Sequence, residues 1–258
     1  MNFTEEELLG YLASFIWPFV RISSMFIAMP VLGVSSLPAP IKILAGLLIT
    51  LVIFPTLPTI PAVDVFGFQG LVITVQQIVL GISAGFILTM VFSIMLFAGQ
   101  YIAYSMGLGF ASLVDPTTGV QVPVIAQFFV ITSSLSFLAI DGHLLMIEML
   151  VQSFHSLPIA VLALEKSDLW RIISWSSQIF ADGVLLALPV MASLLFINIS
   201  FGIASKAAPQ LQIFGVGFPI TILLGMVLIW VGLPVMLEVF TTFLNEGFQL
   251  VSQTLRLK

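Results

Sequence analysis

Residues 103–127 read Ala-Tyr-Ser-Met-Gly-Leu-Gly-Phe-Ala-Ser-Leu-Val-Asp-Pro-Thr-Thr-Gly-Val-Gln-Val-Pro-Val-Ile-Ala-Gln and lie between two long apolar segments. The helix-breaking and acidic residues of this stretch are Gly107, Gly109, Asp115, Pro116, Gly119 and Pro123. Glycine and proline at this density disfavour a continuous helix. The apolar side chains between them, too many for an ordinary surface loop, are Met106, Leu108, Phe110, Leu113 and Val114.

The surroundings of this stretch follow from its backbone. Lipid cannot satisfy the hydrogen-bonding groups of a non-helical segment, so such a segment needs protein around it or a cavity to line. Two interpretations remain open at this point. The stretch is a re-entrant element that closes something, or it is a short connection buried against neighbouring helices.

The composition places the chain among membrane proteins or in an assembly of similar subunits. Sixty per cent of its residues are apolar and 7% are charged, against about a quarter charged in ordinary soluble domains. The absence of cysteine excludes disulfides and thiolate metal sites, and two histidines leave little room for other metal chemistry. A net charge of −5 without a basic patch gives no reason to expect nucleic acid as a partner.

The N-terminal helix is predicted from Glu5 to Met29, ending at Pro30. Thr4 and Glu7 form a capping box at its start. Acidic residues stand where a signal peptide needs lysine or arginine, so we expect this helix to be retained. Arg21 lies inside it, and an arginine there either reaches a lipid headgroup or pairs with a carboxylate on another helix. We favour the carboxylate.

Two further helices are predicted before the stretch at residues 103–127. A short one runs from Lys42 to Phe54 and is followed by a proline-rich connector. The next, from Phe68 to Tyr104, would be about 55 Å long as a single helix, nearly twice the hydrocarbon core of a bilayer. It therefore either tilts and protrudes or bends into two pieces. Gly81 and Gly85 form a small-xxx-small face that allows close helix contact.

The segment from Pro123 to Pro158 is again too long for one membrane span and carries Asp141-Gly142-His143 at its centre. If the helix resumes after Gly142, then Asp141, Glu148 and His155 recur every seven residues on one face. Ionisable groups in an apolar helix must face protein or water. They are either a proton relay or hydrogen-bonding groups that set the register of packing against another subunit, and we favour the second.

The C-terminal third contains two more long helices. Ser167 or Asp168 is predicted to cap the first, which is kinked at Pro189 and ends at Lys206-Ala-Ala-Pro209-Gln210. The last helix is predicted to start at Gly215–Pro219 and to be interrupted at Pro234, with a short tail from Phe248 to Lys258. No catalytic constellation is recognisable anywhere in the chain, so no enzymatic activity, metal or cofactor is expected.

Three stretches together resemble one protein family. They are Met106-Gly-Leu-Gly-Phe-Ala-Ser-Leu-Val-Asp-Pro116, Asp141-Gly-His-Leu-Leu with Phe154-His-Ser-Leu-Pro158, and Lys206-Ala-Ala-Pro-Gln-Leu-Gln-Ile-Phe-Gly-Val-Gly-Phe-Pro219. They are similar to the FliR/SctT family of type III secretion export-gate proteins, and the likeness extends over essentially the whole chain. The last stretch is the most specific. Asp141 stands where the family leads us to expect asparagine.

The resemblance implies a fold and a set of partners. The fold is an all-α, membrane-associated one of long kinked helices and helical hairpins. A FliP-like portion, residues 1–205 or so, is fused to a FliQ-like hairpin completed by residues from about 206 to 258. The subunit takes part in a helical hetero-oligomer with FliP-like and FliQ-like subunits in the bacterial inner membrane, at the flagellar basal body. FlhB-like and FlhA-like components and exported unfolded proteins are further implied partners.

The resemblance also implies a function, in which the loop at about 106–122 plugs an export channel. An apolar, glycine-containing loop can block a channel by dispersion contacts and dewetting and yet move readily. The implied plug residues are Met106, Gly107, Leu108, Gly109, Phe110, Leu113, Val114, Asp115 and Pro116. The residues expected to make partner or inter-helix polar contacts are Arg21, Asp141, His143, Glu148, His155, Lys206, Pro209 and Gln210.

Three alternatives stay open. The chain is an SctT-type subunit of a virulence injectisome, a proton-coupled or small-solute transporter that uses Asp141, Glu148 and His155, or a purely structural adaptor. The flagellar interpretation is preferred from the overall character of the motifs.

Overall fold

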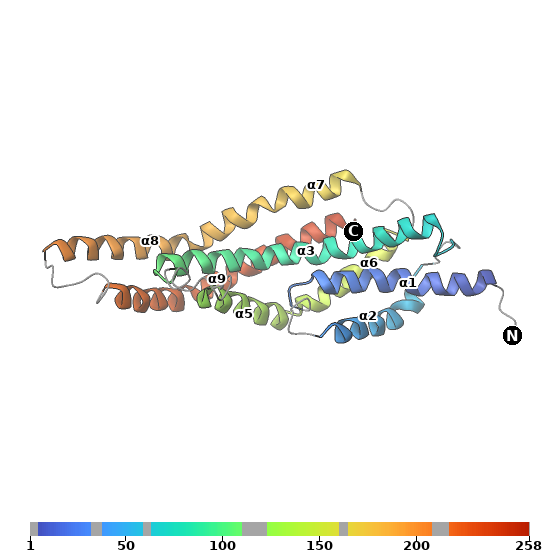
Figure 1. Ribbon diagram of the computed structural model, residues 1–258, viewed down its shortest axis with the longest axis horizontal. Coiled ribbons are helices and arrows are strands. Elements are labelled where there is room, and N and C mark those ends of the chain that lie inside the picture. Colours follow the sequence, from blue (N-terminus) through green and yellow to red (C-terminus); the bar gives the residue numbers. More distant parts are fainter. Residues whose placement is uncertain are drawn as a thin grey trace, which may run out of the picture. The chain divides into compact units, whose positions relative to one another are not determined.

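The computed structural model describes residues 5–31, 38–58, 63–109, 123–159, 165–207 and 217–257. The helices in chain order are α1 (Glu5–Ala28), α2 (Ala39–Ile53), α3 (Phe68–Ser105), α5 (Val124–Ala139), α6 (Gly142–Ser156), α7 (Lys166–Trp175), α8 (Ser177–Ala207) and α9 (Phe218–Thr254), with a 3₁₀ turn, η1 (Phe54–Thr56), after α2 (Figure 1). None of the described residues forms a strand. The predicted all-α fold is confirmed.

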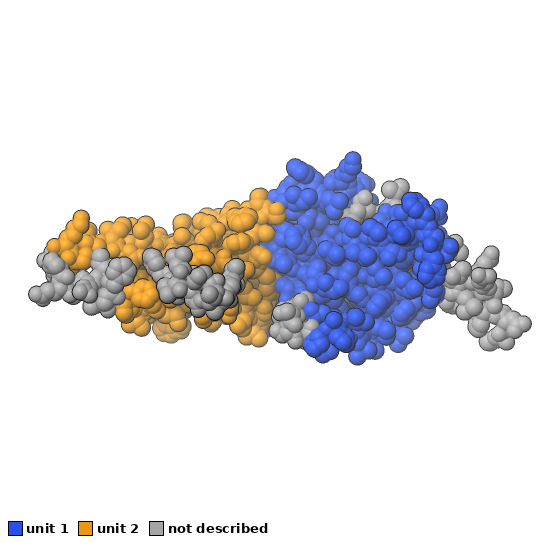
Figure 2. Space-filling view, viewed as in Figure 1, with its two compact units in different colours: residues 1–90, 138–175, 244–258 blue, residues 91–137, 176–243 orange. Residues whose placement is uncertain are grey.

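The chain divides into two compact units (Figure 2). Unit 1 consists of Met1–Met90, Leu138–Trp175 and Leu244–Lys258, and unit 2 consists of Val91–Phe137 and Ser176–Phe243. Helices α3 and α9 therefore contribute to both units. The predicted division into a FliP-like portion and a FliQ-like hairpin follows the resemblance to relatives and stays a prediction.

In unit 1 the backbone of α1 lies directly against α3. A Cβ atom at Gly81 would collide with the carbonyl oxygen of Arg21, and one at Gly85 would lie 2.7 Å from the carbonyl oxygen of Met25. The predicted small-residue face is thus used for close packing. Side chains add to this contact, because the indole Nε1 of Trp17 donates to Thr74 Oγ1 at 3.1 Å.

Helix α2 packs on α1 through one narrow stripe, Gly46, Thr50 and Ile53. It begins at Ala39, three residues before the predicted start at Lys42. The reason is the pair of prolines at this end: Pro38 is the N-cap and Pro40 lies in the first turn. A proline there lacks only an N–H that would be unpaired anyway, and its φ is already helical.

Aromatic side chains form much of the core of unit 2. The ring of Phe92 on α3 meets Phe137 on α5 and Phe240 on α9 edge-to-face, with centroid distances of 5.6 and 5.4 Å. Such pairs are favoured by the ring quadrupole in addition to the area they bury. Phe97 on α3 packs against Phe180 on α8 in a tilted arrangement, with a centroid distance of 5.0 Å and an interplanar angle of 45°. The residues of α3 within unit 2 thus contact three other helices.

Two of the sequence predictions concern long helices with internal breaks. The segment 68–105 is a single helix of 38 residues, so it does not bend into separate pieces. The segment from Pro123 onward does break, because α5 and α6 diverge by 64° at Asp141. Asp141 itself has φ 56°, in the left-handed region that aspartate tolerates better than most residues.

Several predicted boundaries in the C-terminal third are wrong. Helix α7 begins at Lys166, so Ser167 and Asp168 lie inside it. Asp168 accepts a hydrogen bond from the backbone N–H of Glu165 at 3.1 Å, which is the reverse arm of a capping box. The chain turns at Ser176, and α8 then continues through Pro189.

The last helix also differs from its prediction. Helix α9 continues through Pro234 to Thr254, so there is neither an interruption at Pro234 nor a tail from Phe248. A proline removes one backbone hydrogen bond, and long apolar helices tolerate that loss when neighbouring groups compensate. Leu250 and Val251 are buried, so packing holds the end of the helix in place.

The membrane-protein class is also confirmed. In the part of the chain that the structure describes, four helices are long and apolar enough to cross a membrane, or five if the bent pair α5 and α6 is one span. The four are Ala39–Thr56, Phe68–Ser105, Lys166–Lys206 and Phe218–Thr254. These helices differ in burial. In an apolar stretch of 18 residues, 67% of the residues of α3 are buried, against 17–22% in each of the other three. Helix α3 is therefore the most buried of the four.

Candidate functional site

The turn at the end of α3 is the described part of the predicted plug. The N–H of Leu108 donates to the carbonyl of Ala103 and the N–H of Gly107 donates to that of Tyr104, both at 3.0 Å. This pair of bonds is the Schellman motif, which needs a left-handed residue after the helix. Gly107 supplies it with φ 82°, a conformation in which a Cβ atom is unfavourable. The way in which α3 ends therefore depends on the glycine at position 107.

This turn is seated on α9 by apolar contacts. Met106 is 1% exposed, and its side chain lies against Gly225, where a Cβ atom would be 2.7 Å from both Met106 Cγ and Cε. A Cβ atom at Gly107 would lie 2.9 Å from Cε2 of the Phe218 ring. The first residues after α3 therefore fit against α9 only because two positions lack a side chain.

A polar link connects the same turn to α8 and α9. The side-chain amide of Asn198 on α8 donates from Nδ2 to the carbonyl of Ser105 at a long 3.4 Å. Its Oδ1 accepts from the hydroxyl of Thr221 on α9 at 3.1 Å. The last carbonyls of a helix have no partner inside it, so Asn198 supplies a partner for one of them at the point where the helix ends.

Arg21 forms a separate polar cluster, inside unit 1. It is fully buried. Its Nε donates to Gln77 Oε1 at 2.7 Å, its Nη1 to Ser153 Oγ at 3.0 Å, and its Nη2 to the carbonyl of Leu157 at 3.0 Å. The guanidinium carbon lies 4.2 Å from the centroid of the Phe154 ring. The predicted carboxylate partner is not among these contacts, because Gln77, Ser153, the Leu157 carbonyl and Phe154 are all neutral.

Neutral groups suffice here for a physical reason. A guanidinium donates along several directions, and the face of an aromatic ring stabilises a nearby cation. Three acceptors from α3 and from the α6 region hold Arg21 in one orientation, so this residue ties α1 to two other parts of unit 1. The ion pairs found within the described ranges are instead those of Arg256.

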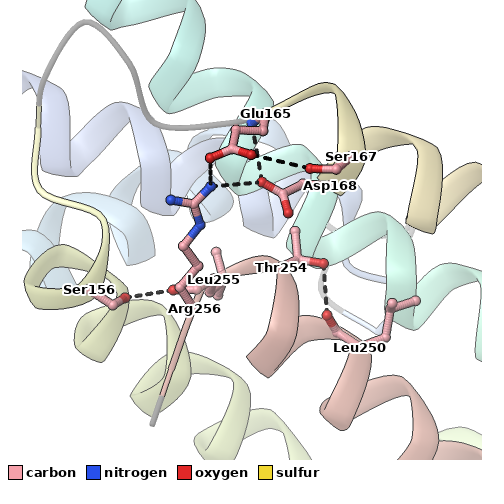
Figure 3. A network of polar contacts seen from close by, with 8 residues as sticks. All are labelled: Ser156, Glu165, Ser167, Asp168, Leu250, Thr254, Leu255 and Arg256. Carbon is pink, nitrogen blue, oxygen red and sulfur yellow. Dashed lines mark hydrogen bonds and ion pairs between the residues drawn. The ribbon is translucent and has the colours of Figure 1, made fainter.

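Arg256 is the centre of a network at the C-terminal end of α9 (Figure 3). Its Nη2 lies 2.9 Å from Glu165 Oε1 and 3.3 Å from Asp168 Oδ2. The hydrogen bond to Glu165, together with the charges of both carboxylates, raises the pKa of the Arg256 guanidinium. Nearby, the hydroxyl of Ser156 donates to the carbonyl of Leu255 at 2.6 Å. Helix α9 thus ends against α6 and the start of α7.

Comparison with known proteins gives the family. The sequence matches the profile described as bacterial export proteins, family 1, over residues 12–247. The chain belongs to this family.

Curated members of the family cover the chain almost end to end. A flagellar biosynthetic protein FliR of Pectobacterium carotovorum subsp. carotovorum is 35% identical over 255 residues, 99% of this chain and 97% of its own length. The FliR of Escherichia coli K12 is 35% identical over 252 residues, 98% and 96% of the two chains. That of Bacillus subtilis 168 is 25% identical over 253 residues, 97% and 96%. The resemblance inferred from the three sequence stretches is confirmed.

Only part of the predicted plug of this export protein can be located. Met106, Gly107, Leu108 and Gly109 belong to the turn just described. The other predicted plug residues lie outside the described residues, and they are Phe110, Leu113, Val114, Asp115 and Pro116. The described part therefore gives the base of the predicted plug.

The predicted ionisable stripe of α6 is exposed in this export protein. Asp141, Glu148 and His155 are all solvent-accessible in the isolated chain. Glu148 accepts a hydrogen bond from the side-chain amide of Gln152, at 3.1 Å, and this partner is neither an acid nor a base. His143 is half-buried, and its Nδ1 has no hydrogen-bond partner in the structure. The geometry within α6 thus does not connect these residues into a relay.

The remaining predicted contact residues lie around the end of α8. Lys206 is exposed in its last turn, whereas Pro209 and Gln210 are outside the described residues. No group of three or more potential metal ligands occurs in the ranges that the structure covers.

Sequence reasoning missed the residues that hold the α3 turn. Asn198, Thr221 and Gly225 lie far from Ser105 in the sequence and come together only through packing. One signal was available, since an amide inside an otherwise apolar helix normally seeks a partner on another helix. Nothing in the sequence indicates which partner that is.

Proposed function

We propose that this chain is a subunit of the flagellar type III protein export gate in the bacterial inner membrane. It helps to form the channel for unfolded flagellar proteins, and residues at about 106–122 plug that channel in its resting state. Membership of the export family and the flagellar names of the relatives support a place in the export apparatus. FliP-like and FliQ-like subunits are its direct partners, and FlhB-like and FlhA-like components are further ones.

One observation carries the plug assignment. Helix α3 ends at Ser105, and the turn formed by residues 106–109 is anchored on α9 through Met106. The sequence from there to Pro123 is apolar and rich in glycine. An anchored base followed by such a segment suits a plug, because apolar contacts close a narrow passage by excluding water and break without the loss of strong hydrogen bonds.

The exposed faces of the chain support an assembly. Only 22% of the residues are buried in the apolar stretches of Lys166–Lys206 and Phe218–Thr254. Large apolar side chains such as Phe196 and Trp230 project from these helices. Apolar surface on this scale requires lipid or other protein. The flagellar export gate is preferred to an injectisome because the relatives named above are flagellar. It is preferred to a transporter because the ionisable residues of α6 are not linked together.

The proposal is tested by deleting residues 107–119 from the full-length chain. The complex with its FliP-like and FliQ-like partners is purified and placed in a planar bilayer, and its ion conductance is recorded. We expect the conductance of the resting complex to rise, because the passage loses its apolar filling. A complex that assembles in normal yield with unchanged conductance would remove the plug assignment.

A further inference from the structure

We propose that Asn198 and Gly225 are positioning residues that hold the base of the plug in its closed place. Together with Thr221 and Phe218 they form what we call the plug seat. The inference rests on the proposed function, since it concerns how the same plug is kept shut. It adds residues of α8 and α9 that lie far in sequence from the loop itself.

The direction of the hydrogen bonds supports the role of Asn198. The hydroxyl of Thr221 lies 3.1 Å from Oδ1 of Asn198 and 2.9 Å from the carbonyl oxygen of Gly217 in its own helix, so its one proton has two possible acceptors. The Ser105 carbonyl can only accept a hydrogen bond, so it fixes the amide orientation by requiring Nδ2 of Asn198 on its side, at 3.4 Å. Rotating the amide by half a turn would place Oδ1 against a carbonyl oxygen. Asn198 thus links the last turn of α3 to the first turns of α9 specifically.

The environment strengthens this link. Asn198 is exposed in the isolated chain, and it lies within the apolar segment Lys166–Lys206, a candidate membrane span. The helix around it carries large apolar side chains, among them Leu195, Phe196 and Ile199. A polar group with few alternative partners gains more from a hydrogen bond than one in water. The hydrogen bond between the Asn198 amide and the Ser105 carbonyl is therefore favoured in such an environment.

Gly225 also positions the turn after α3, because the space that its missing side chain leaves is filled by Met106. Met106 Cγ, Sδ and Cε all lie within 2.9 Å of the place where a Cβ atom would stand. A methyl group at this position forces Met106 to move, because Cγ is close to the backbone and cannot swing away freely. Met106 is the residue directly before the left-handed Gly107, so moving it changes the direction in which the chain leaves α3.

The consequence concerns the closed state. Weaker contacts in the plug seat allow the turn at residues 106–109 to shift, and the plug then closes the export channel less well. The ratio of open to closed states of a two-state plug rises exponentially with the interaction free energy that the closed state loses.

The experiment compares matched variants in the purified complex. Asn198→Ala removes both hydrogen bonds, and Asn198→Asp keeps the acceptor for Thr221 but loses the donor for Ser105. Ser200→Ala is the control, because Ser200 lies on the same helix and its hydroxyl donates to the carbonyl of Phe196 in its own helix. For the glycine, Gly225→Ala is compared with Gly232→Ala, since nothing lies within 4 Å of a Cβ atom at Gly232.

We expect Asn198→Ala, Asn198→Asp and Gly225→Ala to raise the resting conductance about two- to tenfold, the shift that the loss of one neutral hydrogen bond or a small displacement produces. The two control variants should match the unchanged complex. Complex yield should stay the same for all variants, which separates positioning of the plug from a role in assembly.

A second readout follows the base of the plug directly. The chain contains no cysteine, so Leu108→Cys provides a single thiol at the turn. Its rate of labelling by a water-soluble maleimide should rise when Asn198→Ala is added and not when Ser200→Ala is added. Equal rates in the two backgrounds would overturn the inference.

The results separate the two proposals. If deletion of residues 107–119 raises conductance but the seat variants do not, the plug assignment stands and the inference about Asn198 and Gly225 is wrong. If Asn198→Ala lowers complex yield and leaves conductance unchanged, Asn198 serves assembly only and the inference is again overturned. If the deletion itself leaves conductance unchanged, the proposed function fails first.

Discussion

At the scale of single residues, Arg21 illustrates how this chain stabilises a buried cation without an acid. Its guanidinium is held by an amide oxygen, a hydroxyl and a backbone carbonyl, and it lies over the Phe154 ring. Each acceptor removed from such a cluster leaves a charged donor short of a partner, which costs more than the loss of an ordinary hydrogen bond. The acceptors are therefore as important to the fold as Arg21 itself.

Ser153→Ala tests this cluster. We expect it to reduce stability by about 1–3 kcal/mol, because a buried charged donor loses its acceptor. Ser133→Ala is the matched control, since Ser133 is equally buried and its hydroxyl donates to the carbonyl of Phe129 in its own helix. The midpoint temperature of unfolding of the purified complex is measured for both. Equal decreases in the two variants would show that the contact with Arg21 adds nothing.

At the scale of helices, two ends use the same motif with different residues. Helix α3 ends with Gly107 in the left-handed conformation, and α9 ends with Arg256 at φ 52°. At the end of α9 the N–H of Leu257 donates to the carbonyl of Ser252 at 2.9 Å and that of Arg256 to Gln253 at 3.3 Å. An arginine is strained in this place where a glycine is not. Its ion pairs with Glu165 and Asp168 offset that strain.

Replacing Arg256 by two small residues separates strain from charge. Arg256→Ala removes the ion pairs and keeps the strain, whereas Arg256→Gly removes both. A partly exposed ion pair contributes only about 0–1 kcal/mol, and the left-handed strain amounts to about 1 kcal/mol. We therefore expect Arg256→Gly to be nearly neutral and Arg256→Ala to speed amide hydrogen exchange in residues 250–257. Equal exchange rates in the two variants would contradict the role of backbone strain.

The helices also show what sequence reasoning can and cannot reach. The end of α1 at Ala28 and the break at Asp141 follow local rules, because Pro30 and Gly142 stand directly at these points. Pro234 signals a break by the same rules, yet α9 continues through it. In this helix the surrounding packing outweighs one lost backbone hydrogen bond. The plug seat was out of reach, because Ser105, Asn198 and Thr221 are joined only by the tertiary fold.

At the scale of the whole molecule, exposed apolar surface is the dominant feature. Trp230 on α9 is 76% exposed and Phe196 on α8 is 72% exposed. Ordinary soluble monomers keep such patches small. These faces are therefore covered by lipid or by partner subunits in the working assembly.

Trp230→Lys tests that conclusion. A lysine in a hydrocarbon or apolar interface costs about 2.5–3.5 kcal/mol, so we expect the yield of assembled complex to fall more than about tenfold. Trp230→Phe keeps an apolar ring and should assemble normally. Yields are compared by purification through a tagged partner subunit. Normal assembly of the lysine variant would show that this face of α9 stays in contact with water.

The length of α3 has a consequence for how cells make this protein. A helix of 38 residues extends about 57 Å, while a bilayer accommodates only about 30 Å of hydrocarbon. A newly synthesised copy therefore keeps apolar surface outside the membrane until its partner subunits bind. We expect copies produced in excess to be recognised by chaperones and degraded by quality-control proteases. Balanced synthesis of the subunits would then limit how many gates a bacterium builds.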